Sequence, residues 1–415
     1  MTMNKKLLTS ILLAGALSLT FAASCAQNDG DLSSYTSQER YYDKLGTAAR
    51  LVVSADFNDS ENVQKLTELG NAVEDFLNDL ENSLSTSVST SSISRFNQAE
   101  AGAEVQIDYM AYTVLKDAIY MYEYTQGYYN PAVYYSVDLF GFTPRFANYT
   151  FEADISTRTP YDRVGEDEDG MYVTARSEPD EHYVEIFKEL ASHMDELEVY
   201  EKDGAYYARK PDYTVEGLYG DTYSMALDLG GIGKGYAADV VNDLMTQYGF
   251  EYGYFNFGSS SYYVKQSAGT ADNTWAMSLT NPDNIFATYA RFNVKSAGLS
   301  TSGDYEKAYT LNGTTYCHII DPFTGRPKTI GIAACTLVGG TAARDDALTT
   351  ALLVMGEEKA VEFINSNLKD YQIAMIVRGT SGPCEHIVTN VANLEYNTAY
   401  ALGNTIDGDG NIILN

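Results

Sequence analysis

Four glycines in six residues, Gly230 to Gly235, separate a short apolar stretch from a segment with helical spacing. The apolar stretch 226–229 predicts a strand, and residues 236–248 predict the helix that follows. Glycines between a strand and a helix let the backbone approach a phosphate, which the amides of a helix start attract. The spacing matches neither a P-loop nor a dinucleotide fingerprint, and no βαβ unit surrounds it, which excludes both of those folds. The alternative, a glycine-rich packing turn, stays open.

Apolar periodicity elsewhere predicts an α+β chain. Residues 45–55 alternate as a strand does, and apolar residues in 61–84 and 105–124 recur at helical spacing. Towards the C-terminus we expect a strand at 332–338, helices at 343–355 and 358–368, a buried strand at 373–377, and edge structure around a polar turn at 407–410. No fixed-period repeat is visible, so we expect one large domain of two intimate lobes over residues 39–415, with mixed sheets and packed helices.

Residues 145–223 are the least regular part of the chain, and we expect them to form an irregular insertion. A helix is predicted around 183–194. The pair Asp203-Gly204 is a favoured turn and predicts a hairpin between its flanking segments. The acidic loop 165–170 is similar to a Ca²⁺ loop, but it lacks the spaced ligands and the closing Glu, which favours a solvated loop.

The N-terminus has the composition of an export signal. Two lysines precede an apolar run over 7–21, which is shorter than the about 20 residues of a membrane span. Three small residues then precede Cys25, and this order is similar to a bacterial lipobox, where the cysteine is acylated. We therefore predict a signal peptide over 1–24 and a lipid-anchor cysteine with a flexible tether over 25–38. Such a protein is held at the extracytoplasmic face of the bacterial cell membrane. Ordinary signal-peptidase cleavage near the same place is the alternative.

The formal net charge of −30 limits the partners of the protein. Such a surface repels nucleic acid and anionic lipid headgroups, so the only membrane contact expected is through the anchor. An anionic ligand needs a local cation, and Lys234 in the glycine segment would supply it. Cys317, Cys335 and Cys384 show no metal-ligand spacing and are expected to be buried thiols. The 35 tyrosines favour strand-rich structure over a surface that binds cell wall.

A second polar group occupies residues 300–306 and 318–327. Ser302 and Asp304 flank a glycine, where small polar side chains can hydrogen-bond a phosphate or a flavin edge. His318, one of four histidines, stands beside a turn rich in Asp, Pro, Gly and Arg. A lone histidine is more often structural than catalytic, so both interpretations stay open.

A third group lies at 344–351, where helical spacing puts Asp346 and Thr350 on one face. A carboxylate and a hydroxyl are hard oxygen donors suited to Mg²⁺, which usually keeps several waters and binds substrate phosphates. Acids placed at a helix N-terminus to complement the macrodipole would also explain Asp345 and Asp346.

In their order and spacing, these blocks resemble the ApbE family of FAD:protein FMN transferases. The pattern D-x-G-G-I-x-K-G-Y-A-x-D stands at 228–239, S-T-S-G-D-Y-E at 300–306, H-I-I-D-P-x-T-G-R-P at 318–327, and D-A-x-x-T-A at 346–351. Weaker echoes at 45–47, 92–97 and 127–133 extend the resemblance over nearly the whole mature chain.

The resemblance implies an ApbE-like, T-fold-related α+β fold and a Mg²⁺-dependent transfer of FMN from FAD. The acceptor would be a Ser or Thr hydroxyl of an exported protein, and AMP would be released. Mg²⁺ would be held by the Gly231 carbonyl, Asp346 and Thr350, with Thr349 close by. Asp346 and His318 would be catalytic, His318 by assisting proton transfer or positioning the acceptor. The residues implied to contact FAD are Leu45, Tyr128, Tyr129, Asn130, Asp228, Lys234, Ser302, Asp304 and the backbone of Ile320.

Departures from the family pattern fall mostly around the flavin ring. Leu45 replaces the usual Met, Asn130 the usual Asp, Ser87 a Tyr of some members, and Ser259 lies in a changed N-x-G-G segment. Two other functions therefore stay open: an FAD pyrophosphatase that makes FMN and AMP with water, and a flavin-binding lipoprotein without turnover.

Overall fold

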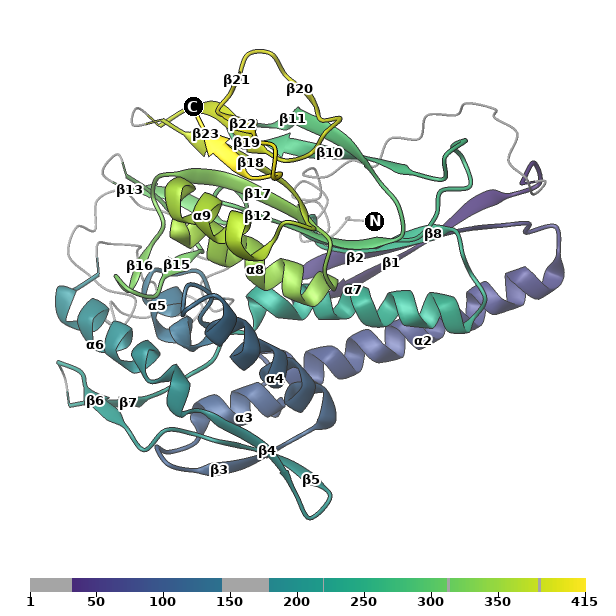
Figure 1. The fold of residues 1–415 in the computed structure, drawn as a ribbon. Coiled ribbons are helices and arrows are strands. Elements are labelled where there is room, and N and C mark those ends of the chain that lie inside the picture. Colours follow the sequence, from purple (N-terminus) through teal and green to yellow (C-terminus); the bar gives the residue numbers. More distant parts are fainter. Residues whose placement is uncertain (1–31, 144–178, 219, 312–313, 380–381) are drawn as a thin grey trace, which may run out of the picture. The chain divides into compact units, whose positions relative to one another are not determined.

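A computed structural model describes residues 32–143, 179–218, 220–311, 314–379 and 382–415 (Figure 1). The predicted signal peptide, Cys25 and the acidic loop 165–170 lie outside the described residues. The chain forms two compact units. Unit 1 holds the described residues up to Leu80, Ile232–Gly303 and Ile330–Asn415, and unit 2 holds Glu81–Gly231 and Asp304–Thr329.

Unit 1 is built on a nine-stranded sheet. In spatial order its strands are β1 (Thr36–Lys44), β2 (Thr47–Ala55), β8 (Gly253–Phe257), β9 (Ser261–Val264), β12 (Ala297–Gly303), β17 (Ile332–Val338), β18 (Gln372–Arg378), β19 (Cys384–Thr389) and β21 (Ala401–Leu402). Neighbouring strands are antiparallel, except that β19 and β21 are parallel. Thr36 pairs with Ala55, so residues 36–38 of the predicted tether belong to the sheet.

Helices and a smaller sheet cover the two faces of this sheet. Figure 1 shows α7 (Gly230–Gln247) and α8 (Ala342–Met355) on one side, and β10 (Trp275–Asn281) and β11 (Asn284–Val294) on the other. The central strand β17 is buried along its whole length, as a strand covered on both faces must be. The other elements of unit 1 are α9 (Glu357–Asn367), β20 (Glu395–Tyr396), β22 (Asn404–Ile406) and β23 (Ile412–Leu414). The helix α2 (Ser60–Leu84) also belongs to unit 1 as far as Leu80, and its last turn belongs to unit 2.

Unit 2 packs short helices and small sheets around an aromatic core that includes Phe140, Tyr183, Phe187 and Tyr316. Its helices are α3 (Ser92–Gln98), α4 (Tyr109–Tyr124), α5 (Tyr134–Leu139) and α6 (Glu181–Ser192), with 3₁₀ turns at Pro131–Val133 and Met194–Glu196. Its strands are β3 (Glu104–Ile107), β4 (Glu198–Lys202), β5 (Ala205–Arg209), β6 (Thr214–Glu216), β7 (Thr222–Ser224), β13 (Ala308–Leu311), β14 (Thr314–Cys317), β15 (Ile320–Asp321) and β16 (Arg326–Pro327).

Most predicted elements are confirmed. The hairpin β4–β5 turns at Asp203 and Gly204, whose φ angles of 54° and 77° are those of a type I′ turn. The predicted helix 105–124 is wrong in its first turn, because residues 104–107 form β3. The helix then begins at Tyr109, where the Asp108 side chain accepts a hydrogen bond from the Ala111 amide.

Two further predictions around the glycine segment are wrong. In the described structure residues 225–229 form no strand, and α7 begins at Gly230 rather than at Tyr236. The backbone of 227–228 bonds to the Asn97 side chain and the Pro131 carbonyl instead of a neighbouring strand. The glycines therefore belong to the first turns of a helix, and the spacing alone did not reveal this.

No helix among the described residues is both long and apolar enough to span a bilayer.

Candidate functional site

Asp346 is the centre of a buried polar cluster in unit 1. Its side chain is 2% exposed on the second turn of α8. Its Oδ2 lies 3.4 Å from Lys234 Nζ and accepts a hydrogen bond of 3.2 Å from the Gly235 amide. Burial raises the pKa of Asp346, while the charge of Lys234 and the Gly235 amide oppose the rise. The carboxylate therefore has a full cation and an amide dipole on one oxygen.

Three hydroxyls are linked to the backbone carbonyl of the same residue, Asp346, two of them directly and one through the other two. Ser302 Oγ, on β12, is 2.9 Å from Thr349 Oγ1 and 3.3 Å from Thr350 Oγ1. Both threonine hydroxyls donate to the Asp346 carbonyl, at 3.0 and 3.2 Å. A hydroxyl that donates its hydrogen to a carbonyl keeps its oxygen lone pairs for another partner. Five of the predicted residues are thus brought together, namely Lys234, Ser302, Asp346, Thr349 and Thr350.

The cluster depends on an unusually close approach of α7 to α8. A Cβ atom at Gly235 would lie 2.0 Å from the Ala342 carbonyl oxygen and 2.6 Å from Ala343 Cα. On β12, a Cβ atom at Gly298 would lie 2.6 Å from the Ala342 amide nitrogen. These atoms all belong to the backbone, so no side-chain rotation relieves the contact. Glycine at both positions is what lets the first turn of α8 lie against α7 and β12.

Asp228 lies in unit 2, directly before α7. Its Oδ1 accepts a hydrogen bond of 2.7 Å from the Gly230 amide, and its own amide donates to the Pro131 carbonyl at 2.8 Å. A carboxylate at a helix start satisfies a free amide and complements the macrodipole. One of the amides predicted to face a phosphate is therefore already bonded to Asp228.

Asn97 is a residue to which the sequence assigned no role, and it holds the segment before Asp228. Its Nδ2 donates to the Leu227 carbonyl at 2.9 Å, and its Oδ1 accepts from the Leu227 amide at 2.8 Å. Lys210 in turn holds the end of α3, because its Nζ donates to the carbonyls of Phe96, Asn97 and Ala99. The only sequence signal for Asn97 was its place in the echo at 92–97.

The residues predicted to line the flavin belong to unit 2 and are partly engaged within it. Asn130 is buried; its Nδ2 donates to the Ala191 carbonyl at 2.9 Å and its Oδ1 accepts from the Ala132 amide at 2.8 Å. Tyr129 is buried, and the Tyr128 ring lies edge-on to Phe323, with ring centroids 4.8 Å apart. The Asn130 amide thus fixes the turn that follows it.

The remaining predicted residues lie on strand ends and turns. His318 lies between β14 and β15, and its amide donates to the Lys307 carbonyl at 3.0 Å. Ile320 pairs with Pro327 in β15–β16, and Asp304 follows β12. In unit 1, Leu45 forms the β1–β2 turn with Gly46, at φ 50°.

The cluster offers oxygen donors, which are the ligands that Mg²⁺ prefers. The described residues contain no group of three or more His, Cys, Asp or Glu side chains that could hold a metal ion. One buried carboxylate with neighbouring hydroxyls suits Mg²⁺, which takes one or two carboxylates and fills its remaining positions with water and phosphate oxygens. The residues present therefore fit a magnesium ion that a phosphate ligand helps to bind.

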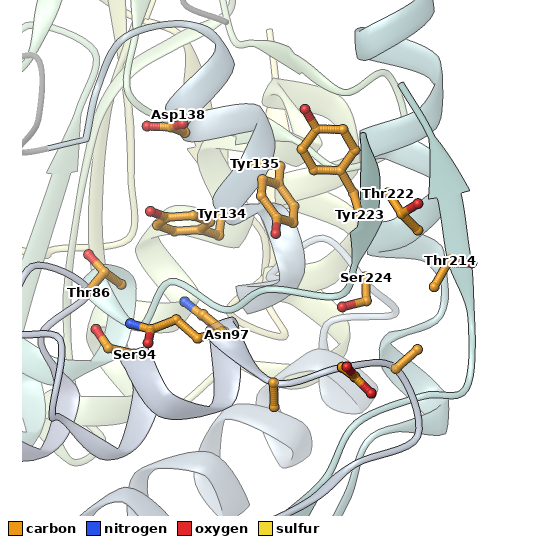
Figure 2. Close-up of a pocket in the computed structure, with 14 residues that line it drawn as sticks. Thr86, Ser94, Asn97, Tyr134, Tyr135, Asp138, Thr214, Thr222, Tyr223 and Ser224 are labelled. Atoms are coloured by element: carbon orange, nitrogen blue, oxygen red, sulfur yellow. The ribbon is translucent and has the colours of Figure 1, made fainter. Parts of the chain in front are cut away.

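A separate pocket of about 570 Å³ opens in unit 2 (Figure 2). Figure 2 shows hydroxyl and aromatic side chains around it, with Asn97 and Ser94 from α3 facing Tyr134 and Tyr135 from α5. The residues described as lining it include Asn97 but none of those predicted to bind FAD or Mg²⁺. We assign no ligand to this pocket.

The fold and the Asp346 cluster define an α+β protein with a small oxygen-donor site beside a lysine. The model of the ApbE family matches residues 45–376, and the chain belongs to this family. Two solved structures share the fold. The flavin transferase ApbE from Vibrio cholerae has a TM-score of 0.62 and 21% identity, covering 88% of this chain and 98% of that one. The flavinyl transferase ApbE of Pseudomonas stutzeri, in its apo form, has a TM-score of 0.63 and 21% identity, with 88% and 96% coverage. The predicted ApbE-like α+β fold is thereby confirmed.

Several curated relatives are named FAD:protein FMN transferase. The relative from Escherichia coli K12 is 36% identical over 157 residues, which are 35% of this chain and 42% of that protein. The relative from Klebsiella pneumoniae strain 342 is 32% identical over 166 residues, 40% of this chain and 46% of that protein. The relative from Vibrio cholerae O395 is 26% identical over 314 residues, 75% of this chain and 79% of that protein. The chain thus spans less than half the length of the first two relatives.

Proposed function

We propose that this protein transfers FMN from FAD to a Ser or Thr hydroxyl of an exported acceptor protein, with Mg²⁺ bound and with release of AMP. The observation that carries the proposal is the buried Asp346 carboxylate, which lies 3.4 Å from Lys234 Nζ. The Thr349 and Thr350 hydroxyls bond to the backbone carbonyl of the same residue, and Ser302 bonds to both threonines. Family membership and the names of the curated relatives support the choice of FAD and FMN.

Asp346 and Thr350 would hold the metal, and the resemblance adds the carbonyl of Gly231 in the first turn of α7. A magnesium ion held there would supply positive charge to the diphosphate of FAD. Lys234 adds a second positive charge, which a chain of net charge −30 must provide locally. The close packing of α7 against α8 holds Lys234 and Asp346 in place before substrate arrives.

In the proposed reaction the acceptor oxygen forms a bond to the phosphorus of the FMN half. The bond between that phosphorus and the bridging oxygen breaks, AMP leaves with that oxygen, and the hydroxyl proton is released. His318 would assist that proton transfer or position the acceptor. Positioning and charge stabilisation suffice for such a step, because phosphoryl transfer requires little covalent chemistry from the protein.

Incubation with FAD, Mg²⁺ and exported proteins of the same cell tests this proposal. Flavin fluorescence that stays on a protein band after denaturing electrophoresis supports transfer. Free FMN and AMP without labelled protein would instead identify a pyrophosphatase, which is the second candidate because water can replace the acceptor hydroxyl in the same site. Tight FAD binding with no AMP at all would identify a flavin-binding protein and refute both enzymes.

We further propose that Cys25 carries a lipid anchor and holds the protein at the outer face of the cell membrane. The proposal is supported by the lysines, the apolar run and the small residues that precede Cys25. An exported enzyme tethered there would meet acceptor proteins outside the cytoplasm.

A further inference from the structure

Asp239 closes the block 228–239, and neither the sequence nor the proposed reaction assigns it a role. It lies on α7, and its two carboxylate oxygens accept hydrogen bonds from two successive amides at the start of α8. Oδ1 accepts from Ala342 at 2.8 Å and Oδ2 from Ala343 at 2.9 Å. The next amide, that of Arg344, donates to the Thr341 side chain at 3.3 Å. Asp239 on α7 is therefore a bidentate N-terminal cap of α8.

A second contact runs in the opposite direction one turn away. Asp346 on α8 accepts from the amide of Gly235 on α7 and lies 3.4 Å from Lys234 Nζ. Asp239 and Gly235 are four residues apart on α7, and Ala342 and Asp346 are four apart on α8, so each pair shares a helix face. Two carboxylates thus tie the same two helices together, each bonded to backbone amides of the other helix.

These hydrogen bonds between α7 and α8 restrict movement of the start of α8. Ala342 is enclosed by Gly235 and Gly298, and its carbonyl accepts a 3.3 Å hydrogen bond from Ser300 Oγ. A helix start held on three sides cannot shift without carrying Asp346 with it, because Asp346 lies one turn further along the same helix. We propose that Asp239 is a positioning residue, which sets the Asp346 carboxylate against Lys234 and the Gly235 amide.

The chemistry of the cap makes this inference specific. Both oxygens are acceptors, and each meets an N–H group. An amide side chain offers only one oxygen, so Asp239→Asn loses one bond and sets an NH₂ group against an N–H group. The neutral amide also loses the charge that complements the start of α8. Asn is nearly the same size as Asp, so the substitution tests the acceptors rather than the packing.

Hydrogen exchange resolved to single amides tests the positioning without any substrate. Asp243, one turn further along α7, is exposed, and Asp243→Asn removes the same charge from the same helix as a matched control. We expect Asp239→Asn to speed exchange of the Ala342 and Ala343 amides about tenfold or more, since a charge-assisted bond is lost. The Gly235 amide should also exchange faster, because its partner Asp346 moves. Faster exchange at 342 and 343 with an unchanged Gly235 amide would reduce Asp239 to a local cap and overturn the inference.

A second measurement uses Mg²⁺, and this part rests on the proposed function. If Asp239 positions Asp346, Asp239→Asn should raise the Mg²⁺ concentration for half-maximal AMP release by about fivefold or more, and saturating Mg²⁺ should restore most of the rate. Asp243→Asn should match the wild type. Equal half-saturation in wild type and Asp239→Asn would overturn the inference. A wild type that releases no AMP would refute the proposed function instead, and the exchange of Gly235 would still decide the role of Asp239.

Discussion

Replacing Gly235 by alanine tests the contact that holds the candidate site together. The added Cβ would lie 2.0 Å from the Ala342 carbonyl oxygen, whereas real Cβ atoms essentially never come closer than 3.0 Å. The start of α8 would therefore have to withdraw by about 1 Å, which stretches the Asp239 bonds to Ala342 and Ala343 from 2.8 and 2.9 Å beyond hydrogen-bond range.

The size of the effect follows from those two bonds. Hydrogen bonds to a charged group contribute about 1.5–3 kcal/mol each. Alanine is better than glycine inside a helix by about 1 kcal/mol, which offsets part of the loss. We therefore expect Gly235→Ala to lower the free energy of unfolding by about 2–5 kcal/mol. The rate of the proposed FMN transfer should also fall, because Asp346 moves with the start of α8.

Gly70→Ala is the matched control. Gly70 lies inside α2, and a Cβ there would be in ordinary contact, with its nearest neighbour, Arg40 Nε, at 3.7 Å. Without a clash, the same substitution should stabilise the protein by up to about 1 kcal/mol. Urea and thermal unfolding followed by circular dichroism should shift in opposite directions for the two variants. A midpoint for Gly235→Ala at or above that of the wild type would refute the close approach of α7 to α8.

Three further predictions concern other parts of the chain. Asp346→Ala should lower the proposed Mg²⁺-dependent AMP release at least about a hundredfold, as measured by chromatography of the products, while the exposed Asp243→Ala leaves it unchanged. Lys210 is 1% exposed, and burial lowers its pKa to about 8, so the unfolded chain binds more protons between about pH 8 and 10.5. In urea titrations, the free energy of unfolding of the wild type should therefore rise by about 2 kcal/mol relative to that of Lys210→Met between pH 7.5 and 9.5. A difference between the two proteins that does not change with pH would contradict the lowered pKa. Cys25→Ser should move the exported protein from the membrane fraction to the soluble fraction on immunoblots; retention in the membrane fraction would rule out the lipid anchor.

Features that depend on near neighbours in the chain could be predicted from the sequence. The Asp203-Gly204 turn needs positive φ at two successive residues, a demand that this pair meets on its own. Asp346 and Thr350 share a face because they are four residues apart in a helix, and the helical period showed this without any tertiary contact. The ordered motifs likewise indicated the family before any distance was known.

The errors arose where distant parts of the chain decide the local structure. Residues 226–229 have the composition of a strand, yet their backbone bonds to Asn97, which is 130 residues from Leu227. The segment Gly230–Gly235 was expected to precede the helix, but it is helical, and Gly235 admits α8 at close range. Helix propensity could not predict this helical segment, because propensity depends on the local sequence and the contact of Gly235 with another helix is tertiary.

The sequence by itself determined the family, the class of fold and the residues with oxygen and ammonium groups suited to a phosphate and a magnesium ion. Only the tertiary structure decided how those groups are held. Asp239 and Ala342 are 103 residues apart, so no local sequence pattern relates them, yet Asp239 Oδ1 lies 2.8 Å from the Ala342 amide nitrogen. The physical reason is that a carboxylate partly shielded from water needs hydrogen-bond donors, and the packing of α7 against α8, not the spacing of residues, supplies those of Asp239.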